Sequence, residues 1–325
     1  METKTDLPKM FYKYGRQLYD AFLYKAETIT VPEEFTEIAK KVCRKIGWNP
    51  RIIGERYDFK IADFPDNRKT LIALSGGLDS TYLLHKLKDA GDEVIAVHVE
   101  GLNKSSAHIE AEHAAKLANL AGVPFIRVKF HAPAQTFPDN PFKNQLVLAI
   151  MLMIGAGRGV YRYGVGSDWT TTLAASVTGF TVTDSADVYR AFWAGVEKHF
   201  PQAELVFIPD RERKGERLEY LFRNHRATLE NVSSCIAPQR FRKHLHEENA
   251  KKYNVPLMKD RCGSCYKCAM EYLLLAYNGL IPTDGRFEAH CWKTLATSKT
   301  AHRPDLFALS LPLQKRIENL KSYGS

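Results

Sequence analysis

The glycine-rich segment Ser75–Ser80 (SGGLDS) limits what this chain can fold into more than any other part of the sequence. It stands directly between an apolar run, Thr70–Leu74 (TLIAL), and a run with helical spacing, Thr81–Leu87 (TYLLHKL). Two adjacent glycines allow a tight turn whose N–H groups point inward, and the start of a helix adds a partial positive charge. The order of strand, glycine turn and helix therefore predicts an anion-binding loop at the edge of an α/β sheet.

The side chains of this loop favour a phosphate ligand. Ser75 and Ser80 offer hydroxyl donors, and Asp79 is suited either to hold Mg²⁺ or to cap the helix. The loop is not a Walker A motif, since no Gly-Lys-Ser/Thr ends it, and it lacks the GxGxxG spacing of a dinucleotide site. The alternative is a structural turn with an Asp or Ser helix cap, which many α/β proteins contain.

The sequence after Lys69 alternates strand and helix patterns, which favours βαβ units and a doubly wound parallel sheet with helices on both faces. We expect five strands, at Thr70–Leu74, Glu93–Val99, Phe125–Phe130, Val160–Val165 and Leu205–Ile208. Residues 1–68 read as an extension of unknown role, with helical patterns at Tyr14–Tyr24 and Phe35–Ile46. Residues 69–232 are expected to form the nucleotide-binding α/β domain, and residues 233–325 a smaller, mostly helical module.

Composition excludes several classes of protein. The longest apolar run, Leu146–Ile154, is far shorter than the roughly 20 residues that a membrane-spanning helix needs. The first residues carry both signs of charge and lack the apolar core of a secretory signal, so we expect a cytoplasmic protein without a membrane partner. A formal net charge of +9 attracts anions but does not distinguish a nucleotide from a nucleic acid.

Three cysteines fall within the short segment Cys262–Cys268 (CGSCYKC). Thiolates at this spacing can share one tetrahedral ion, which favours a structural zinc site; an iron–sulfur cluster and three merely buried cysteines are the alternatives. The fourth ligand is open at this point. Candidates are Cys235, Cys291, His244, His246 and His290, whereas Cys43 is expected to be a core residue.

The loop motif SGGLDS resembles that of the PP-loop ATP pyrophosphatases, which include GMP synthetase, lysidine synthetase and tRNA thiolation enzymes. The resemblance implies that ATP is cleaved to AMP and pyrophosphate. It also implies that the phosphates bind at the loop and that the adenine packs against the end of the second strand, near Val97–Glu100. The residues implied to bind ATP are Leu74, Ser75, Gly76, Gly77, Leu78, Asp79, Ser80, Val99 and Gly166.

Loop and cysteines together resemble the 7-cyano-7-deazaguanine synthases, over about residues 69–275. Further points of resemblance are Asn140–Asn144 (NPFKN), Tyr163–Asp168 (YGVGSD), Asp184–Asp187 (DSAD) and Lys214–Arg217 (KGER). The resemblance implies four zinc ligands, which are Cys235, Cys262, Cys265 and Cys268. It implies that Lys214 binds phosphate, and that Asp168 and Asp184 bind the heterocycle or assist proton transfer. A loop carboxylate that caps a helix is the alternative for each aspartate.

The reaction implied is attack of a substrate carboxylate on ATP, followed by displacement of AMP by ammonia to give an amide or, after a second round, a nitrile. The implied partners are a 7-deazaguanine-type acid and ammonia, with a homodimer left open. The sequence departs from the family after the second strand, where Tyr-Gly-Gln-Arg-His is replaced by Glu100–Ser106 (EGLNKSS). The chemistry is therefore better supported than the acceptor.

Two other classes compete with this reading. An RNA-modifying enzyme on the same loop, such as a tRNA thiolase or a lysidine-type ligase, is favoured by basic segments at Arg211–Lys214, Arg240–Lys243 and Lys251–Lys252. Most such segments are solvated helix faces. A non-catalytic zinc module that binds nucleotide would keep the loop but would not exchange pyrophosphate into ATP.

Overall fold

The computed structural model describes the chain in separate stretches: residues 12, 15–17, 20–21, 26–33, 36–45, 48–55, 69–102, 107–130, 143–156, 158–166, 186–208, 212–232, 239–253, 261–282 and 284–297. The central element is a five-stranded sheet in the order β5-β4-β3-β6-β7, in which all neighbours run parallel. Its strands are β3 (Lys69–Ala73), β4 (Glu93–Glu100), β5 (Phe125–Lys129), β6 (Arg162–Val165) and β7 (Glu204–Val206). The predicted α/β class and all five predicted strands are confirmed, with shifts of a few residues at their ends.

The strand order reverses next to β3, because the chain first builds β4 and β5 on one side and then crosses to β6 and β7 on the other. Loops that leave the carboxyl ends of β3 and β6 therefore diverge and open a crevice at this switch point. The register pairs Ala73 with Val97 on one side and with Val165 on the other. The segment that follows β3 is the predicted phosphate loop, so the topology places the loop in the crevice.

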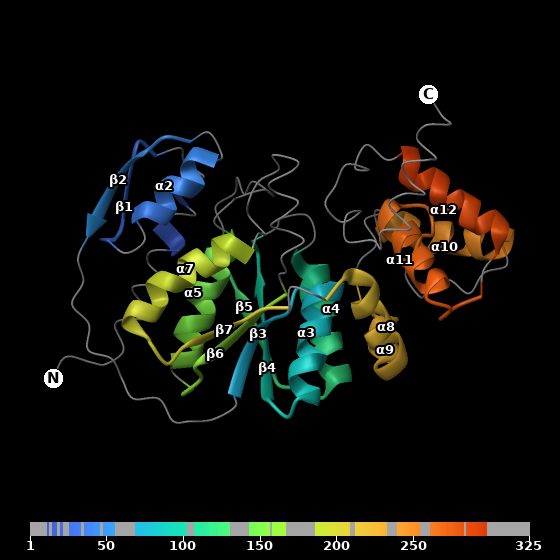
Figure 1. Cartoon of the computed structure of the whole chain (residues 1–325), viewed down its shortest axis with the longest axis horizontal. Helices are drawn as coiled ribbons and strands as arrows, with labels where there is room; N and C mark the ends of the chain where they lie inside the picture. Colours follow the sequence, from blue (N-terminus) through green and yellow to red (C-terminus); the bar gives the residue numbers. More distant parts are fainter. Residues whose placement is uncertain are drawn as a thin grey trace.

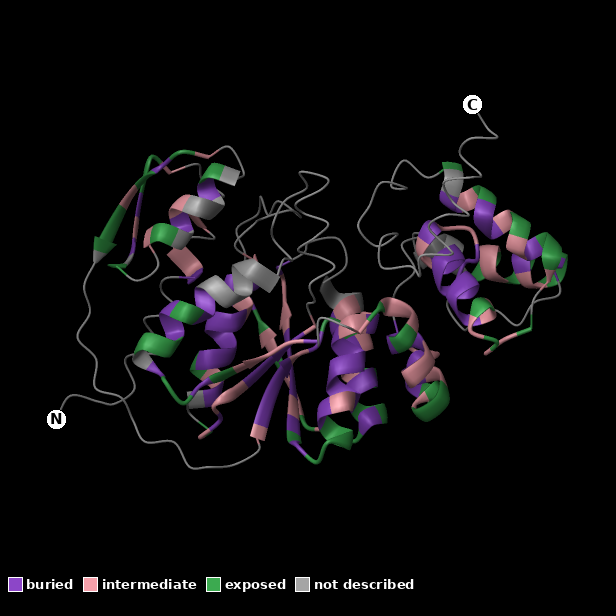
Figure 2. Cartoon of the chain, in the orientation of Figure 1, coloured by how far each residue is buried: buried purple, intermediate pink, exposed green. Residues whose placement is uncertain are grey.

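Helices cover both faces of the sheet (Figure 1). One face carries α3 (Leu78–Asp89) and α4 (Ala107–Ala121), and the other carries α5 (Lys143–Ala156) and α7 (Ala186–His199). Helix α5 is apolar almost all round because it is buried on two sides: Leu148 and Met151 join the core beneath the sheet, whereas Leu146 and Ile150 pack with Leu102 and Phe130. Buried residues accordingly concentrate on the strands, α3 and α5 (Figure 2).

The N-terminal part forms a two-stranded parallel sheet of β1 (Thr28–Pro32) and β2 (Arg51–Glu55), joined by α2 (Thr36–Lys45). Cys43 is only 2% exposed and packs in the same cluster as residues of α5 and α7, so its expected place in a core is confirmed. The helix predicted at Phe35–Ile46 is present as α2. The helix predicted at Tyr14–Tyr24 falls largely outside the described residues.

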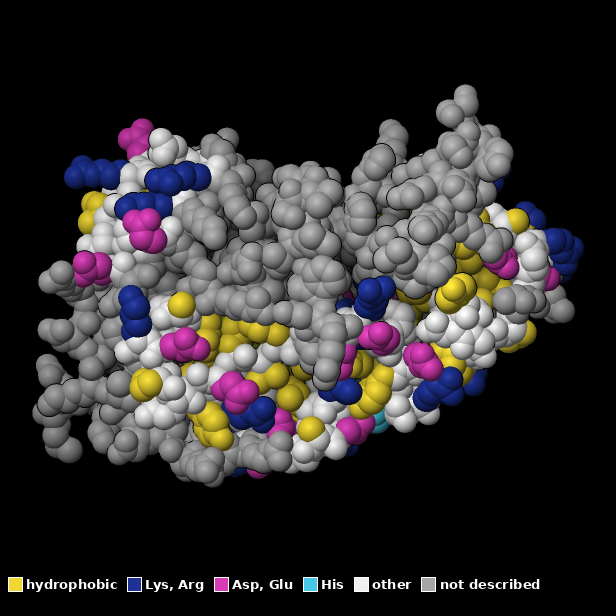
Figure 3. Space-filling model, viewed as in Figure 1, with side chains coloured by type: hydrophobic (Ala, Val, Ile, Leu, Met, Phe, Trp, Pro, Cys, Tyr) yellow, Lys and Arg dark blue, Asp and Glu magenta, His cyan; other side chains and the backbone are white. Residues whose placement is uncertain are grey.

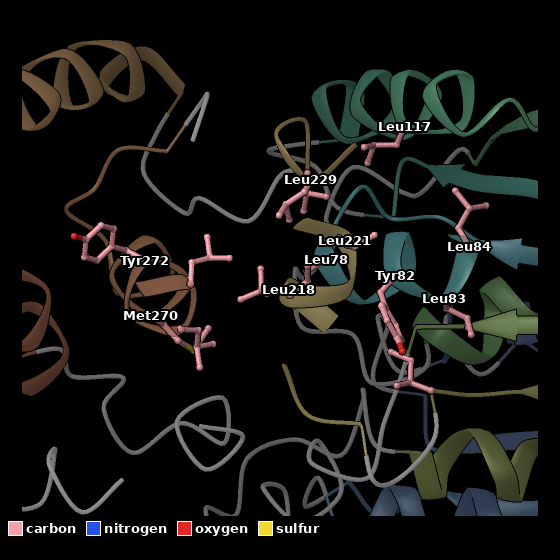
Figure 4. Close-up of a cluster of buried hydrophobic side chains, with 14 of the residues drawn as sticks. Leu78, Tyr82, Leu83, Leu84, Leu117, Leu218, Leu221, Leu229, Met270 and Tyr272 are labelled. Atoms are coloured by element: carbon pink, nitrogen blue, oxygen red, sulfur yellow. The ribbon is translucent and has the colours of Figure 1, made fainter. Parts of the chain in front are cut away.

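The C-terminal helices are α10 (Gln239–Tyr253), α11 (Tyr266–Tyr277) and α12 (Gly285–Thr297). They share one apolar cluster with the sheet region through α8 (Lys214–Asn224) and the short α9 (Arg226–Leu229). Leu218 and Leu221 of α8 belong to the same apolar cluster as Leu78 of α3 and Met270 of α11, and Leu218 lies between Leu78 and Met270 in Figure 4. None of the helices within the described stretches is both long and apolar enough to cross a membrane.

A stacked histidine pair links α3 to the segment after α8. His85 is only 3% exposed, and its ring stacks on that of His225 at 3.8 Å. His225 Nε2 in turn lies 2.7 Å from Asp89 Oδ2, which also accepts a hydrogen bond from the Tyr220 hydroxyl. The pKa of His85 is lowered to about 4, chiefly by burial and also by the nearby His225 and Lys88, against an opposing effect of Asp89.

This arrangement predicts a loss of stability in acid. Below pH 6.5 the unfolded chain binds a proton at residue 85 that the folded chain excludes until about pH 4, so the free energy of unfolding falls over that window. The full loss is about 3 kcal/mol. His85→Phe keeps a stacked ring but cannot titrate, so urea unfolding from pH 7 to 4 is expected to show a shallower decline than in the wild type. Equal declines in the two proteins would contradict the prediction.

Candidate active site

The loop after β3 adopts a turn that needs glycine. Gly76 has φ +83°, in the left-handed region, and Gly77 follows in an extended conformation as the N-cap of α3. The hydroxyls of Ser75 and Ser80 lie 3.0 Å apart, and Ser75 N donates to Ser80 Oγ at 3.2 Å. These contacts close the loop on itself and bring both serines to one point.

At the start of α3 a side-chain hydroxyl donates to a backbone carbonyl, but no side chain accepts from the first N–H groups of the helix. Thr81 Oγ1 donates to Gly77 O at 2.7 Å, and no side chain caps the first N–H groups of this helix. The alternative role of Asp79 as a helix cap is therefore not realised. The uncapped helix start can bind an anion, because its N–H groups carry the positive end of the helix dipole.

Gly166, directly after β6, lies against the backbone of the loop. A Cβ atom at this position would stand 2.5 Å from Ser80 N and 2.9 Å from the carbonyl carbon of Asp79. Only glycine permits so close an approach without movement of the backbone. The contact fixes the end of β6 to the start of α3 and forms one wall of the crevice.

The crevice contains a cavity of about 240 Å³. It brings together five of the residues that the sequence predicted to bind ATP: Leu74, Ser75, Ser80, Val99 and Gly166. Val97 and Leu102 add apolar walls at the end of β4. An apolar region beside an anion-binding loop suits a ligand that combines a flat ring with phosphates.

Sequence reasoning missed four polar residues of the cavity wall, which are His98, Glu110, Lys143 and Asn144. His98 is buried, and its Nδ1 lies 2.8 Å from Leu74 O. Because a carbonyl oxygen can only accept, Nδ1 is the donor of this hydrogen bond. The available signal was a histidine that replaces an apolar residue within the run Glu93–Val99. Lys143 and Asn144 belong to the segment Asn140–Asn144, which the sequence marked as a point of resemblance without giving either residue a role. Glu110 lies in the first turn of α4 and carries no comparable signal.

Asp79 is paired with an arginine far away in the chain. Arg217 Nη1 donates to Asp79 Oδ1 at 2.7 Å, and Nη2 donates to the carbonyl of Glu212 at 2.7 Å. The side chain of Arg217 is 2% exposed, whereas that of Asp79 is 35% exposed. The sequence had singled out Lys214 of the same segment; it is the first residue of α8, three residues before Arg217.

Cys262, Cys265 and Cys268 come together with their sulfur atoms within 4.8 Å of one another. Cys262 and Cys268 are buried, and Cys265 is the N-cap of α11. Cys262 Sγ accepts hydrogen bonds from the backbone N–H groups of Ser264 (3.4 Å) and Cys265 (3.3 Å). Such bonds stabilise a thiolate, so the three sulfurs fit a metal centre better than they fit an apolar core.

Neighbouring helices hold the cysteine segment in place. Asn249 of α10 donates to Cys262 O at 2.8 Å, and His246 Nδ1 lies 2.8 Å from Arg261 O. Arg261 forms a buried ion pair with Glu271 at 2.6 Å and also donates to Val232 O.

Within the described stretches, no other cysteine, histidine or carboxylate belongs to this sulfur group, so His244, His246, His290 and Cys291 are not part of it here. Cys235, Asp168 and Asp184 lie outside the described residues. Cys235 stands three positions after Val232, whose carbonyl is bound by the residue preceding Cys262.

The fold and the loop define a nucleotide-binding α/β protein whose phosphate loop follows the first strand of the parallel sheet. Residues 53–138 match the family model of the PP-loop domain. Over these residues the chain is similar to the PP-loop domain, in agreement with the resemblance of its loop motif to the PP-loop ATP pyrophosphatases. The match covers less than half of the chain.

Three curated proteins match the chain in part, and two of them are described here. The tRNA(Ile)-lysidine synthase of Chlamydia pneumoniae is 33% identical over 91 residues, which are 28% of this chain and 28% of that protein. The tRNA-specific 2-thiouridylase MnmA of Campylobacter lari is 40% identical over 81 residues, which are 25% of this chain and 22% of that protein. The chain thus spans less than a third of the length of each relative.

Among solved structures, the tRNA thiolase NcsA from Methanococcus maripaludis, with its 4Fe–4S cluster, is 16% identical. The match covers 67% of this chain and 73% of that one, with a TM-score of 0.39.

Proposed function

We propose that this protein is an ATP-dependent enzyme that adenylates a substrate carboxylate and then reacts it with ammonia, giving an amide or a nitrile and releasing AMP and pyrophosphate. The acceptor is 7-carboxy-7-deazaguanine or a related acid. The observation that carries the proposal is the cavity at the sheet edge, where the phosphate loop, Gly166 and Val99 meet. The PP-loop match over residues 53–138 supports the use of ATP.

The chain's own groups would act mainly by placement and charge. The carboxylate oxygen attacks the α-phosphorus of ATP, and the electron pair of the broken P–O bond leaves on pyrophosphate. The N–H groups at the start of α3 and the hydroxyls of Ser75 and Ser80 stabilise that leaving group. Ammonia then attacks the acyl carbon, AMP leaves, and Asp168 or Asp184 takes the released proton. Lys214 adds positive charge for the phosphates.

Two metal ions fit these residues. Asp79 would hold Mg²⁺ through the carboxylate oxygen that does not accept the hydrogen bond from Arg217, and the ion would neutralise phosphate charge. Cys262, Cys265 and Cys268 would hold Zn²⁺ together with Cys235, and this site would be structural because no ligand position is left open. An iron–sulfur cluster is the alternative for the same three thiols.

A second candidate is a PP-loop enzyme that modifies RNA. It is favoured by two of the curated relatives, both of which are named as enzymes of tRNA. Lys243 of the predicted basic segments is 88% exposed, but it lies 3.9 Å from Glu247 in a surface ion pair. On the face drawn in Figure 3, basic and acidic side chains of the described residues are mixed near the middle of the molecule, and further basic side chains stand at its two ends.

The decisive experiment is exchange of labelled pyrophosphate into ATP, with 7-carboxy-7-deazaguanine or bulk tRNA as the acceptor. We expect exchange with the acid, and a loss of at least about a hundredfold in Asp79→Ala, because the carboxylate beside the loop is removed. Asp284→Ala is the matched control. It removes the side chain that accepts from Arg286 N and Phe287 N at the start of α12, so it lowers stability without touching the cavity.

Exchange that depends on tRNA alone would favour the second candidate. ATP binding without exchange, whichever acceptor is offered, would favour a non-catalytic nucleotide-binding module.

A further inference from the structure

Arg217 is a cation buried beside the phosphate loop. Among the described residues it is the largest side chain that is fully buried. A charged side chain is rarely buried to this extent unless its hydrogen bonds are satisfied by partners, since it loses the solvation of water. Its two terminal nitrogens bind Asp79 and the carbonyl of Glu212, each at 2.7 Å. The guanidinium thus ties the first turn of α3 to the start of α8.

The position of this contact matters for the predicted phosphate site. Asp79 is the second residue of α3 and belongs to the loop motif itself. Lys214 lies three residues before Arg217, so both project from the same side of α8. The guanidinium therefore holds the carboxylate of Asp79 and lies one helical turn from Lys214, the second charged side chain that the sequence assigned to the phosphates.

Other polar contacts join α3 to α8 and to Glu212, which precedes α8. Tyr82 donates to the carboxylate of Glu212, and Lys86 Nζ lies 3.7 Å from the same carboxylate. Tyr220 donates to Asp89 at the far end of α3. These contacts can hold the helices together without Arg217, so a purely structural role does not account for a buried charge at the loop.

We propose that Arg217 is a positioning residue for the phosphate site. It occupies Oδ1 of Asp79 and thereby sets the orientation of the carboxylate, so that the second oxygen is presented to the divalent cation that accompanies ATP. The inference rests on the proposed function in one respect, which is that the ligand of the loop is ATP with Mg²⁺.

The test is the Mg²⁺ dependence of ATP binding, measured by titration calorimetry with a non-hydrolysable ATP analogue. We expect Arg217→Met to raise the Mg²⁺ concentration for half-maximal binding by about tenfold, because the carboxylate loses its fixed orientation. Arg217→Lys keeps the charge but loses the two-pronged contact, so its shift is expected to be smaller. Tyr220→Phe is the matched control: it removes one α3–α8 hydrogen bond, lowers Tm, and leaves the Mg²⁺ dependence unchanged.

If Arg217→Met keeps the wild-type Mg²⁺ dependence and only lowers Tm, as Tyr220→Phe does, then Arg217 has a structural role and does not position Asp79. If Arg217→Met does not fold, the Mg²⁺ dependence of Arg217→Lys is used instead. This variant is expected to fold because a cation still faces Asp79. A wild-type protein that does not bind ATP with Mg²⁺ overturns the proposed function, and this inference with it. Normal wild-type binding with unshifted Arg217 variants overturns the role of Arg217 alone.

Discussion

Gly166→Ala is expected to remove ATP binding while leaving most of the fold intact. The added Cβ would stand 2.5 Å from Ser80 N and 2.7 Å from its Cα, and both are backbone atoms that cannot rotate away. Either β6 or the start of α3 must move, which displaces the loop relative to the cavity. A shift of about 1 Å at such a site costs roughly a hundredfold in binding or rate. Overpacking of this kind lowers the free energy of unfolding by about 1–3 kcal/mol.

The measurement is ATP affinity by calorimetry together with urea unfolding. Gly285→Ala is the matched control, because Gly285 opens α12, where a Cβ meets nothing within 4 Å. This control is expected to keep wild-type affinity and to gain a little helix stability. Wild-type ATP affinity in Gly166→Ala would mean that the nucleotide does not use the wall formed by β6.

Cys262→Ser is expected to abolish metal binding and to destabilise the C-terminal helices. Its sulfur accepts two backbone hydrogen bonds, and it lies with those of Cys265 and Cys268 within 4.8 Å. A metal that binds only the folded chain stabilises it by about 4 kcal/mol when its free concentration is about 1,000 times the dissociation constant. Removing one ligand, or adding a chelator to the wild type, should therefore lower Tm strongly.

Metal content by mass spectrometry and thermal unfolding measure this effect. Cys291→Ser is the matched control, since Cys291 is buried in α12 but is not part of the sulfur group. It should lower Tm through its buried hydroxyl and keep the metal. Cys235→Ser tests the fourth ligand. Bound iron and a brown colour in place of zinc would establish the iron–sulfur alternative, and wild-type metal content in Cys262→Ser would contradict the site.

Much of the fold could be predicted because its signals are local. Short apolar runs such as Thr70–Leu74 and Glu93–Val99 can form buried parallel strands, and the glycine pair at 76 and 77 specifies a tight turn before a helix. The spacing of Cys262, Cys265 and Cys268 placed three thiols on one short segment, which the structure brings together. In each case the residues that interact are near neighbours in the chain, so spacing alone carries the information.

The tertiary structure decided the contacts between distant segments. Arg217 meets Asp79 across 138 positions, and neither the motif nor the KGER segment indicated this pairing. The approach of Gly166 to Ser80 depends on β6 lying beside β3, and the cavity positions of His98 and Lys143 depend on which strands and helices end at the same edge.

By itself, therefore, the sequence determined the anion-binding turn, the strand and helix order and the thiol cluster. Only packing decided how the phosphate loop is held and which charges surround it. The physical reason is that backbone preferences act between near neighbours, whereas burial of a charge or close backbone contact depends on elements that the folded topology brings together.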